Sequence, residues 1–274
     1  MKDQLIILDG VSDPEAEIRL GRQLYEFVRG RLVLARRSDR ESDREAQEAR
    51  IQSILSGPQF AEIQIEQVSF SGSWSGAILD MLRSGSYAVL ILSPWLANRQ
   101  EKFFSQEVLG RIIAQSPCPV AVSKGRIGQL RRILICDSGA DIVPILDRFL
   151  EKMSDLASSQ VEITILHVMS QMTAYPGVRG AQLRADAEEL ILEHSPEGIV
   201  LEHDLDLLDR VNPHPKPKIR HGLVVDEIMK ETDEAEYDLI VIGAHRGEGW
   251  QRYLLQNIAS EIVEKAKTPV MLIP

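Results

Sequence analysis

The chain has few cysteines and no spacing of residues that would bind a metal. Cys118 and Cys136 are its two cysteines, and they are too far apart in sequence to suggest a ligand pair. We expect both to be small buried side chains with no disulfide. The six histidines show no His-x-x-x-His pair, so no metal site is predicted. A Gly-x-Ser-x-Gly elbow is also missing, and Ser71 to Gly76 is expected to cap a helix.

Long apolar runs are absent as well. The longest, such as Leu5 to Leu8 and Ala88 to Leu92, are far shorter than the roughly 18 to 20 residues that span a bilayer. No direct membrane insertion is predicted. The first residues reach Asp9 before an apolar signal core forms, so we interpret them as a first strand and expect a cytoplasmic protein.

Basic residues are outnumbered by acidic ones. The sequence has 31 Lys and Arg against 41 Asp and Glu, a formal net charge of -10. Binding to a phosphate backbone requires a basic face, so no nucleic-acid partner is predicted.

Two similar halves account for the length of 274 residues. The run Tyr87 to Ser93 corresponds to Tyr237 to Gly243 at an offset of 150 residues, and Pro119 corresponds to Pro269 at the same offset. Near the starts of the copies the offset falls to 128, where Asp9 corresponds to Asp137. The second copy therefore carries 22 extra residues. They include a proline-rich stretch, 212–217, that we expect to be an exposed surface loop, and the sequence assigns no role to the 203–220 insertion.

Each copy alternates strands and helices, which predicts parallel strands joined by crossover helices. The expected fold is α/β: two tandem, open, parallel five-stranded sheets with helices on both faces, of the Rossmann-like nucleotide-binding type. The expected domains are residues 1–125 and 129–274. In the second copy we expect strands near 132–136, 162–168, 217–221, 238–243 and 269–273, and helices near 141–156, 180–194, 223–235 and 253–266.

A glycine-containing segment follows the fourth strand of the second copy. Residues Gly243 to Gly249 read GAHRGEG, and a helix with Asn257 and Ile258 comes next. This arrangement resembles the signature of the universal stress protein family. The ATP-binding branch of that family has glycine, two residues, glycine, nine residues, glycine, then serine or threonine.

Three of the four signature positions differ here. Gly243 matches the first glycine, but Arg246, Gln256 and Asn257 replace the two other glycines and the hydroxyl residue. A side chain at a glycine position obstructs the approach of backbone N–H groups to phosphates. Arg246 could instead supply a positive charge to an anion, so a modified anion site stays open.

The resemblance implies further ligand contacts in the second domain. Asp137 matches the family's adenosine-contacting aspartate, Val168 matches the residue beside the adenine, and His245 matches a histidine common in the signature. The candidate cofactor-binding residues are Asp137, Val168, Gly243, His245, Asn257 and Ile258. A structural alternative remains for Asp137, which could cap the following helix.

The first domain departs further from the family pattern. Arg36 stands where Val168 would be, the loop after the fourth strand starts without glycine, and Asp9 is the one matching residue. We therefore predict no nucleotide in this domain.

The functional hypothesis is a stress-related binding or regulatory module that is not an enzyme and binds ATP weakly or not at all. The alternative is a sensor of ATP, AMP or another anion in the second domain; a weak ATPase is a third hypothesis. We expect no other cofactor. The protein partner is not identified. Single-domain members of the family commonly dimerise through their last strands, and the proline-led strands 119–122 and 269–273 resemble that element, which implies that the tandem chain can satisfy this interface within itself. A homodimer in addition to this intramolecular pairing stays open.

Overall fold

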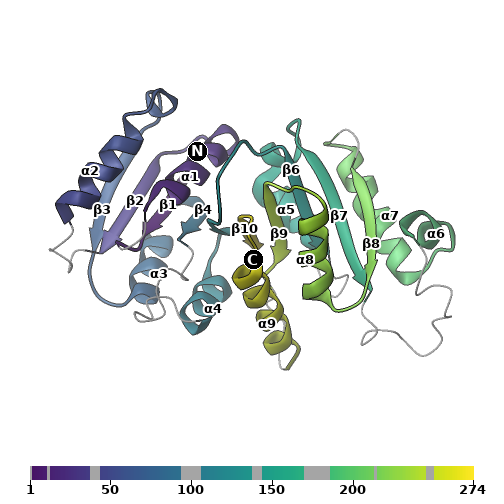
Figure 1. Ribbon diagram of the computed structural model, residues 1–274. Coiled ribbons are helices and arrows are strands. Elements are labelled where there is room, and N and C mark those ends of the chain that lie inside the picture. The colour runs from purple at the N-terminus through teal and green to yellow at the C-terminus, as the bar shows by residue number, and fades with distance from the viewer. Residues whose placement is uncertain are drawn as a thin grey trace. The chain divides into compact units, whose positions relative to one another are not determined.

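The computed structural model describes residues 2–10, 13–37, 44–93, 106–137, 144–169, 186–212, 215–244 and 250–274. For residues 44, 106–107 and 250–257 only the course of the backbone is described. The chain divides into two compact units (Figure 1). Unit 1 comprises residues 1–129 with 267–272 and 274, and unit 2 comprises 130–266 with 273.

Unit 1 is built on a sheet with the strand order β3-β2-β1-β4-β5-β10. Its strands are β1 (Asp3–Leu8), β2 (Leu32–Arg37), β3 (Ile65–Phe70), β4 (Tyr87–Leu92), β5 (Val120–Val122) and β10 (Val270–Ile273). β1 to β5 are parallel, and β10 pairs antiparallel with β5. The central strands are apolar and fully buried, as expected of parallel strands covered on both faces.

Helices cover the sheet of unit 1. They are α1 (Glu15–Val28), α2 (Arg44–Leu55), the short 3-10 helix η1 (Pro58–Phe60), α3 (Trp74–Ser84) and α4 (Gln106–Gln115). α1 packs on β1 and β4 and contacts α2, whereas α3 contacts α4. Ser73 caps α3, since its side chain accepts a hydrogen bond from the Gly76 N–H at 3.3 Å. The expected capping role of residues 71–76 is therefore confirmed.

Unit 2 has parallel strands in the order β9-β6-β7-β8. They are β6 (Arg132–Asp137), β7 (Glu162–Met169), β8 (Lys216–His221) and β9 (Leu239–Gly243). The helices are α5 (Ile145–Ala157), α6 (Ala187–Leu192), α7 (Pro196–Asp209), α8 (Val224–Glu234) and α9 (Trp250–Lys265). α5, α6 and α7 contact one another or the sheet, while α8 packs on β7 and against α9.

The α/β class with parallel strands is confirmed, and one strand differs from the expectation. β10 was expected as the fifth strand of the second sheet, but residues 267–272 group with unit 1, where Met271 pairs with Ala121. Only Ile273 groups with unit 2, where its carbonyl accepts a hydrogen bond from the Ala244 N–H at 2.7 Å. β5 therefore forms backbone hydrogen bonds with a strand on each side, β4 and β10, and is not an edge strand.

Between β7 and β8 the described residues include a helix, α7, that the sequence interpretation did not predict. Ser195 caps α7, since its side chain accepts a hydrogen bond from the Gly198 N–H at 2.9 Å, and Pro196 is the first residue of the helix. Its buried face carries Gly198, Leu201 and Leu208. The prediction that residues 212–217 are exposed is wrong for the first of them, Asn212. Asn212 is 1% exposed, because its amide turns inward to the backbone at the end of α5.

None of the described helices is long and apolar enough to cross a lipid bilayer. Neither cysteine forms a disulfide; Cys118 is buried and Cys136 is partly exposed. Burial, together with the nearby carboxylates of Glu231 and Asp137, raises the pKa of the Cys136 thiol. This thiol is consequently a poor nucleophile at neutral pH.

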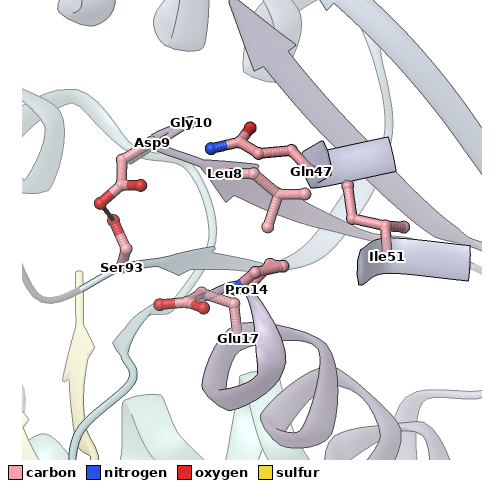
Figure 2. Close-up of a pocket in the computed structure, with 8 residues that line it drawn as sticks. All are labelled: Leu8, Asp9, Gly10, Pro14, Glu17, Gln47, Ile51 and Ser93. Carbon is pink, nitrogen blue, oxygen red and sulfur yellow. Dashed lines mark hydrogen bonds between the residues drawn. The ribbon is translucent and has the colours of Figure 1, made fainter. Parts of the chain in front are cut away.

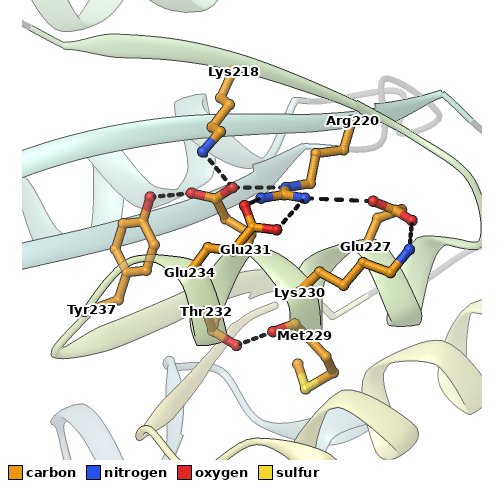
Figure 3. A network of polar contacts seen from close by, with 9 residues as sticks. All are labelled: Lys218, Arg220, Glu227, Met229, Lys230, Glu231, Thr232, Glu234 and Tyr237. Atoms are coloured by element: carbon orange, nitrogen blue, oxygen red, sulfur yellow. Dashed lines mark hydrogen bonds and ion pairs between the residues drawn. The ribbon is translucent and has the colours of Figure 1, made fainter.

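An ion-pair network joins α8 to the edge strand β8 (Figure 3). The Glu231 carboxylate is fully buried and lies 2.6 Å from Lys218 Nζ and 2.7 Å from Arg220 Nε. The Tyr237 hydroxyl donates a third bond to Glu231 at 2.7 Å. Burial raises the pKa of Glu231, but these three donors more than offset it and the pKa is lowered overall. Glu231 is therefore ionised, and its ion pairs with Lys218 and Arg220 hold α8 against β8.

We expect Glu231→Ala to lower the free energy of unfolding by about 3 kcal/mol or more, because it leaves the Arg220 guanidinium without its buried partner. Glu234→Ala removes an exposed partner of the same guanidinium and should change stability little. Urea denaturation of both variants measures the difference. Equal effects of the two substitutions would show that Glu231 does not fasten α8.

Asn212 provides a second test of the fold. Its Nδ2 donates to the carbonyls of Ala157, Ser159 and Val161 at 2.9, 3.3 and 3.0 Å. Asn212→Ala removes these bonds and should cost about 1 to 3 kcal/mol. Asn212→Asp should be worse, because it turns a carboxylate toward carbonyl oxygens. Thermal unfolding checks this order, and two variants as stable as the wild type would contradict it.

Candidate functional site

The strand order of unit 2 creates a switch point between β6 and β9. Chain connections leave in opposite directions from these neighbouring strands, which is where open α/β sheets bind ligands. Cys136 pairs with Ile242, so the next residues, Asp137 and Gly243, end adjacent strands. Two of the predicted site residues are thus brought to one edge of the sheet.

A second carboxyl group lies against Asp137. Asp204 of α7 is fully buried and Asp137 is 5% exposed. The two carboxyl groups are within hydrogen-bonding reach of each other, which requires a proton on one of them. Burial raises the pKa of Asp204 well above its usual range, and the negative charges of Asp137 and then Asp147 add to the rise. The pair therefore holds a proton in a range where an exposed aspartate is ionised.

Histidines flank this pair. His167 on β7 is in register with Asp137 and is 6% exposed. Burial lowers the pKa of His167, although the carboxylates of Asp137 and Glu197 oppose the shift. His203, half-exposed on α7, has its Nδ1 3.6 Å from Asp204 Oδ1. The pair of carboxyl groups is thus next to a neutral buried imidazole and a more exposed one.

The other predicted residues are less well defined. Val168 is half-buried on β7, one residue beyond His167, and Ile258 is half-buried on α9. Asn257 belongs to α9, but its side chain is not among those described. His245 and Arg246 lie outside the described residues, as do the residues that follow Asp137, so the signature loop and the capping alternative stay predictions.

Unit 1 has a small pocket at the corresponding edge of its own sheet (Figure 2). Its volume of about 230 Å³ includes space open to solvent, and the enclosed part has room for about one water molecule. Its lining residues are Leu8, Asp9, Gly10, Pro14, Glu17, Gln47, Ile51 and Ser93. Asp9 was expected to be the one relevant residue here, but polar side chains from α1, α2 and the end of β4 surround it.

Two serines hold the acidic groups of this pocket. Ser93 Oγ donates to Asp9 Oδ2 at 3.2 Å, and Ser123 Oγ donates to Glu17 Oε1 at 2.7 Å. Glu17 is 2% exposed. Burial raises the pKa of Glu17 to about 7, against the opposing hydrogen bond from Ser123. Within the described ranges, no three His, Cys, Asp or Glu side chains converge as metal ligands would.

Sequence interpretation missed Asp204 and Glu17, the most buried acids of the two edges. Both lie on the apolar side of an amphipathic helix: Glu17 with Ile18 and Leu24, and Asp204 with Leu201 and Leu208. In each helix the acid occupies a position three or four residues from buried apolar residues, where a core residue is expected. This spacing is the sequence signal by which they could have been predicted.

Two α/β units with mostly parallel strands define a tandem protein of the Rossmann-like fold class. The model of the "Universal stress protein family" matches residues 131–274, more than half of the chain. The chain belongs to the universal stress protein family, and the resemblance of the sequence is confirmed.

Solved structures agree on the fold. A protein of unknown function from Pseudomonas aeruginosa matches 100% of this chain and 92% of its own, at 13% identity and a TM-score of 0.69. A universal stress protein from Archaeoglobus fulgidus matches 99% and 95%, at 16% identity and a TM-score of 0.61. The cytoplasmic domain of a prokaryotic cation chloride cotransporter matches 99% and 94%, at 15% identity and a TM-score of 0.54. No curated protein sequence matches the chain.

The proton on the buried pair predicts a pH dependence of stability. Because the folded-state pKa of Asp204 is raised, its contribution is fully present below the ordinary aspartate pKa of about 4 and is lost as the pH rises toward the folded value. Asp204→Asn keeps the shape and removes the proton. The variant should be more stable than the wild type by about 2 kcal/mol above neutral pH.

Urea denaturation over a pH series measures this difference. Asp206→Asn, at an exposed position of the same helix, is the matched control and should follow the wild-type profile. If Asp204→Asn runs parallel to the wild type at every pH, the buried pair does not hold the proton.

Proposed function

We propose that this protein is a non-catalytic binding and regulatory module of the universal stress protein family, with weak or no binding of ATP. The observation that carries the proposal is the burial of Asp137 against Asp204. A carboxylate that contacts a nucleoside needs an accessible oxygen, and here the Asp137 side chain is 5% exposed and lies against a second carboxyl group. Asp204 of α7 thus occupies the hydrogen-bonding capacity of Asp137 that a ligand would use.

The phosphate side of the site supports the same conclusion. Arg246 and Gln256 replace two signature glycines, and side chains at such positions obstruct the backbone cradle of phosphates. A net charge of -10 and the second buried carboxyl group also oppose a polyanionic ligand. Neither edge brings together a nucleophile and a base among the described side chains that would favour turnover.

We therefore infer that the module acts by binding and regulating a protein partner. The same fold forms the cytoplasmic domain of a cation chloride cotransporter, which is compatible with a role exerted on another protein. The partner is a second copy of the chain or a different protein, consistent with the expectation of dimers from the family resemblance.

An adenine nucleotide or anion sensor in unit 2 is the second candidate. It is favoured by the convergence of Asp137 and Gly243 at the switch point. Arg148 in the first turn of α5 adds a positive charge near the Ile273 carbonyl, at 3.2 Å from Nη1. A ligand that displaced Asp204 from Asp137 would restore the family contact.

Calorimetric titration with ATP, ADP and AMP in magnesium buffer tests the proposal. The wild type should bind none of them with a Kd tighter than about 1 mM, and Asp137→Ala should behave like the wild type. Asp204→Ala, which uncovers Asp137, is the variant expected to gain affinity. Submillimolar binding by the wild type that is lost in Asp137→Ala would overturn the proposal and establish the sensor.

A further inference from the structure

The net negative charge of the chain is concentrated in two helices of unit 2, α6 and α7, which pack beside β8 (Figure 1). Residues 186–209, called the acidic hairpin below, contain nine Asp and Glu but no Lys or Arg. They carry nine of the ten net negative charges of the sequence, so the remaining chain is nearly neutral. The structure describes residues 186–212 without a gap. The negative charge is therefore a local feature of this hairpin.

The acids of the hairpin are not neutralised by neighbouring cations. Among the ion pairs between described residues, the one that involves the acidic hairpin joins His203 to the buried Asp204. Acids elsewhere on the surface differ. Glu15, Glu66 and Glu162, for example, each lie within 2.7 Å of an arginine or lysine nitrogen. The charges of the acidic hairpin instead face solvent.

The positions of these acids reduce the stability of α7. Glu202, Asp206 and Asp209 are exposed at spacings of four and three residues, where like charges repel each other. The last turn of the helix contains no basic residue, and Asp206 and Asp209 lie there at the negative end of the helix dipole. Lysine or arginine at these positions would stabilise α7. Stability of the fold therefore does not account for the acids.

Exposed apolar side chains accompany the acids. In the described part of the chain four large apolar side chains are exposed, and three of them lie in the hairpin or just beyond it. They are Leu192, Ile199 and Val211, which are 79%, 54% and 39% exposed. A Cβ at Gly198 would lie 2.0 Å from the Leu190 carbonyl oxygen, so α7 passes directly against the end of α6. Leu192 and Ile199 are each within two residues of this contact and therefore lie close together.

We propose that the acidic hairpin binds an amphipathic, lysine- or arginine-rich segment of a partner protein. Ile199 lies three residues before Glu202, so one face of α7 carries both an apolar side chain and acids. Cations of the partner segment pair with Glu202, Asp206 and Asp209, and its apolar side chains pack on Leu192 and Ile199. This inference rests on the proposed function, because it names the surface through which the module binds its partner.

Other occupants fit this surface less well. Nucleic acids and anionic membranes carry the same sign of charge as the hairpin and are repelled by it. A second copy of the chain brings an equally negative hairpin and an otherwise nearly neutral sequence, so it supplies no excess of cations. A basic segment compensates the charge and covers the apolar side chains at the same time.

Fluorescence anisotropy tests the surface, with the full chain titrated into a labelled amphipathic peptide of leucine and lysine about 14 residues long. We expect a Kd of about 10 μM at low salt, weakened at least about tenfold at about 0.5 M salt because exposed charges are screened. Two control peptides should bind at least about tenfold more weakly. One has glutamate in place of lysine, and the other has lysine but no leucine.

Substitutions on the hairpin separate binding from folding. Glu202→Gln combined with Asp209→Asn should weaken peptide binding at least about fivefold and raise the melting temperature, because it removes repelling charges and one that opposes the helix dipole. Leu192→Ser combined with Ile199→Ser should weaken binding at least about tenfold, since two apolar contacts are lost. A purely structural role of the two acids would not give weaker binding together with higher stability.

Matched controls are exposed residues outside the hairpin. Glu62→Gln combined with Glu236→Gln changes the net charge by the same amount, and Leu223→Ser removes an apolar side chain that is 63% exposed. Both control variants should bind the peptide as the wild type does.

The proposal is overturned if the wild type binds the peptide no more tightly than about 1 mM, if the lysine peptide without leucine binds equally well, or if hairpin and control variants bind alike. It is also overturned if the wild type self-associates and Leu192→Ser with Ile199→Ser dissociates it, because the occupant is then a second copy. The nucleotide titration decides on the proposed function independently, so its failure is distinguished from failure of this surface.

Discussion

Removing a carboxylate from water is the constraint on which both units depend. Three helices carry an acidic residue on the face that packs against a sheet, and each acid is stabilised differently. Glu231 receives two cations and a tyrosine hydroxyl, so it remains ionised and serves as a structural link. Glu17 has a serine and Asp204 has a neighbouring carboxyl group, so both favour the protonated form. The difference between a structural acid and a responsive one lies in the number of donors that surround it.

This constraint also explains why two copies of one fold present different sites. In both units an aspartate lies at the carboxyl end of the first strand, beside the switch point of the sheet: Asp9 follows β1 and Asp137 is the last residue of β6. In unit 2 the helix α7 brings Asp204 over that aspartate and removes it from solvent. In unit 1 the second acid comes from α1 itself, and a small pocket remains beside it. Duplication has conserved the backbone geometry while the chemistry at the two edges has diverged.

The strands, the repeat and the family were predictable from the sequence, because continuous apolar runs such as Leu5 to Leu8 form buried parallel strands. The helix α7 (Pro196–Asp209) was not, since the expected helix ended at residue 194 and the stretch 203–220 was interpreted as an insertion. Glu17 and Asp204 were missed for a related reason: acidic residues in amphipathic helices are usually exposed. Burial depends on which face meets the sheet, and only the structure defines that face. The pairing of β10 with β5 agrees with the family resemblance of the two proline-led last strands, whereas their alternation with helices alone predicted only parallel strands.

That strand pairing has a consequence for synthesis on the ribosome. β5 ends at Val122, but its antiparallel partner begins at Val270, after almost the whole of unit 2. At the usual elongation rates of about 5 to 20 residues per second, the edge of β5 stays open for roughly ten seconds or more while the second unit emerges. An unpaired parallel edge is a template for strands of other nascent chains. Folding of the first unit is thus complete only after the second unit has been translated. A chain whose translation stops before β10 would expose the unpaired edge of β5.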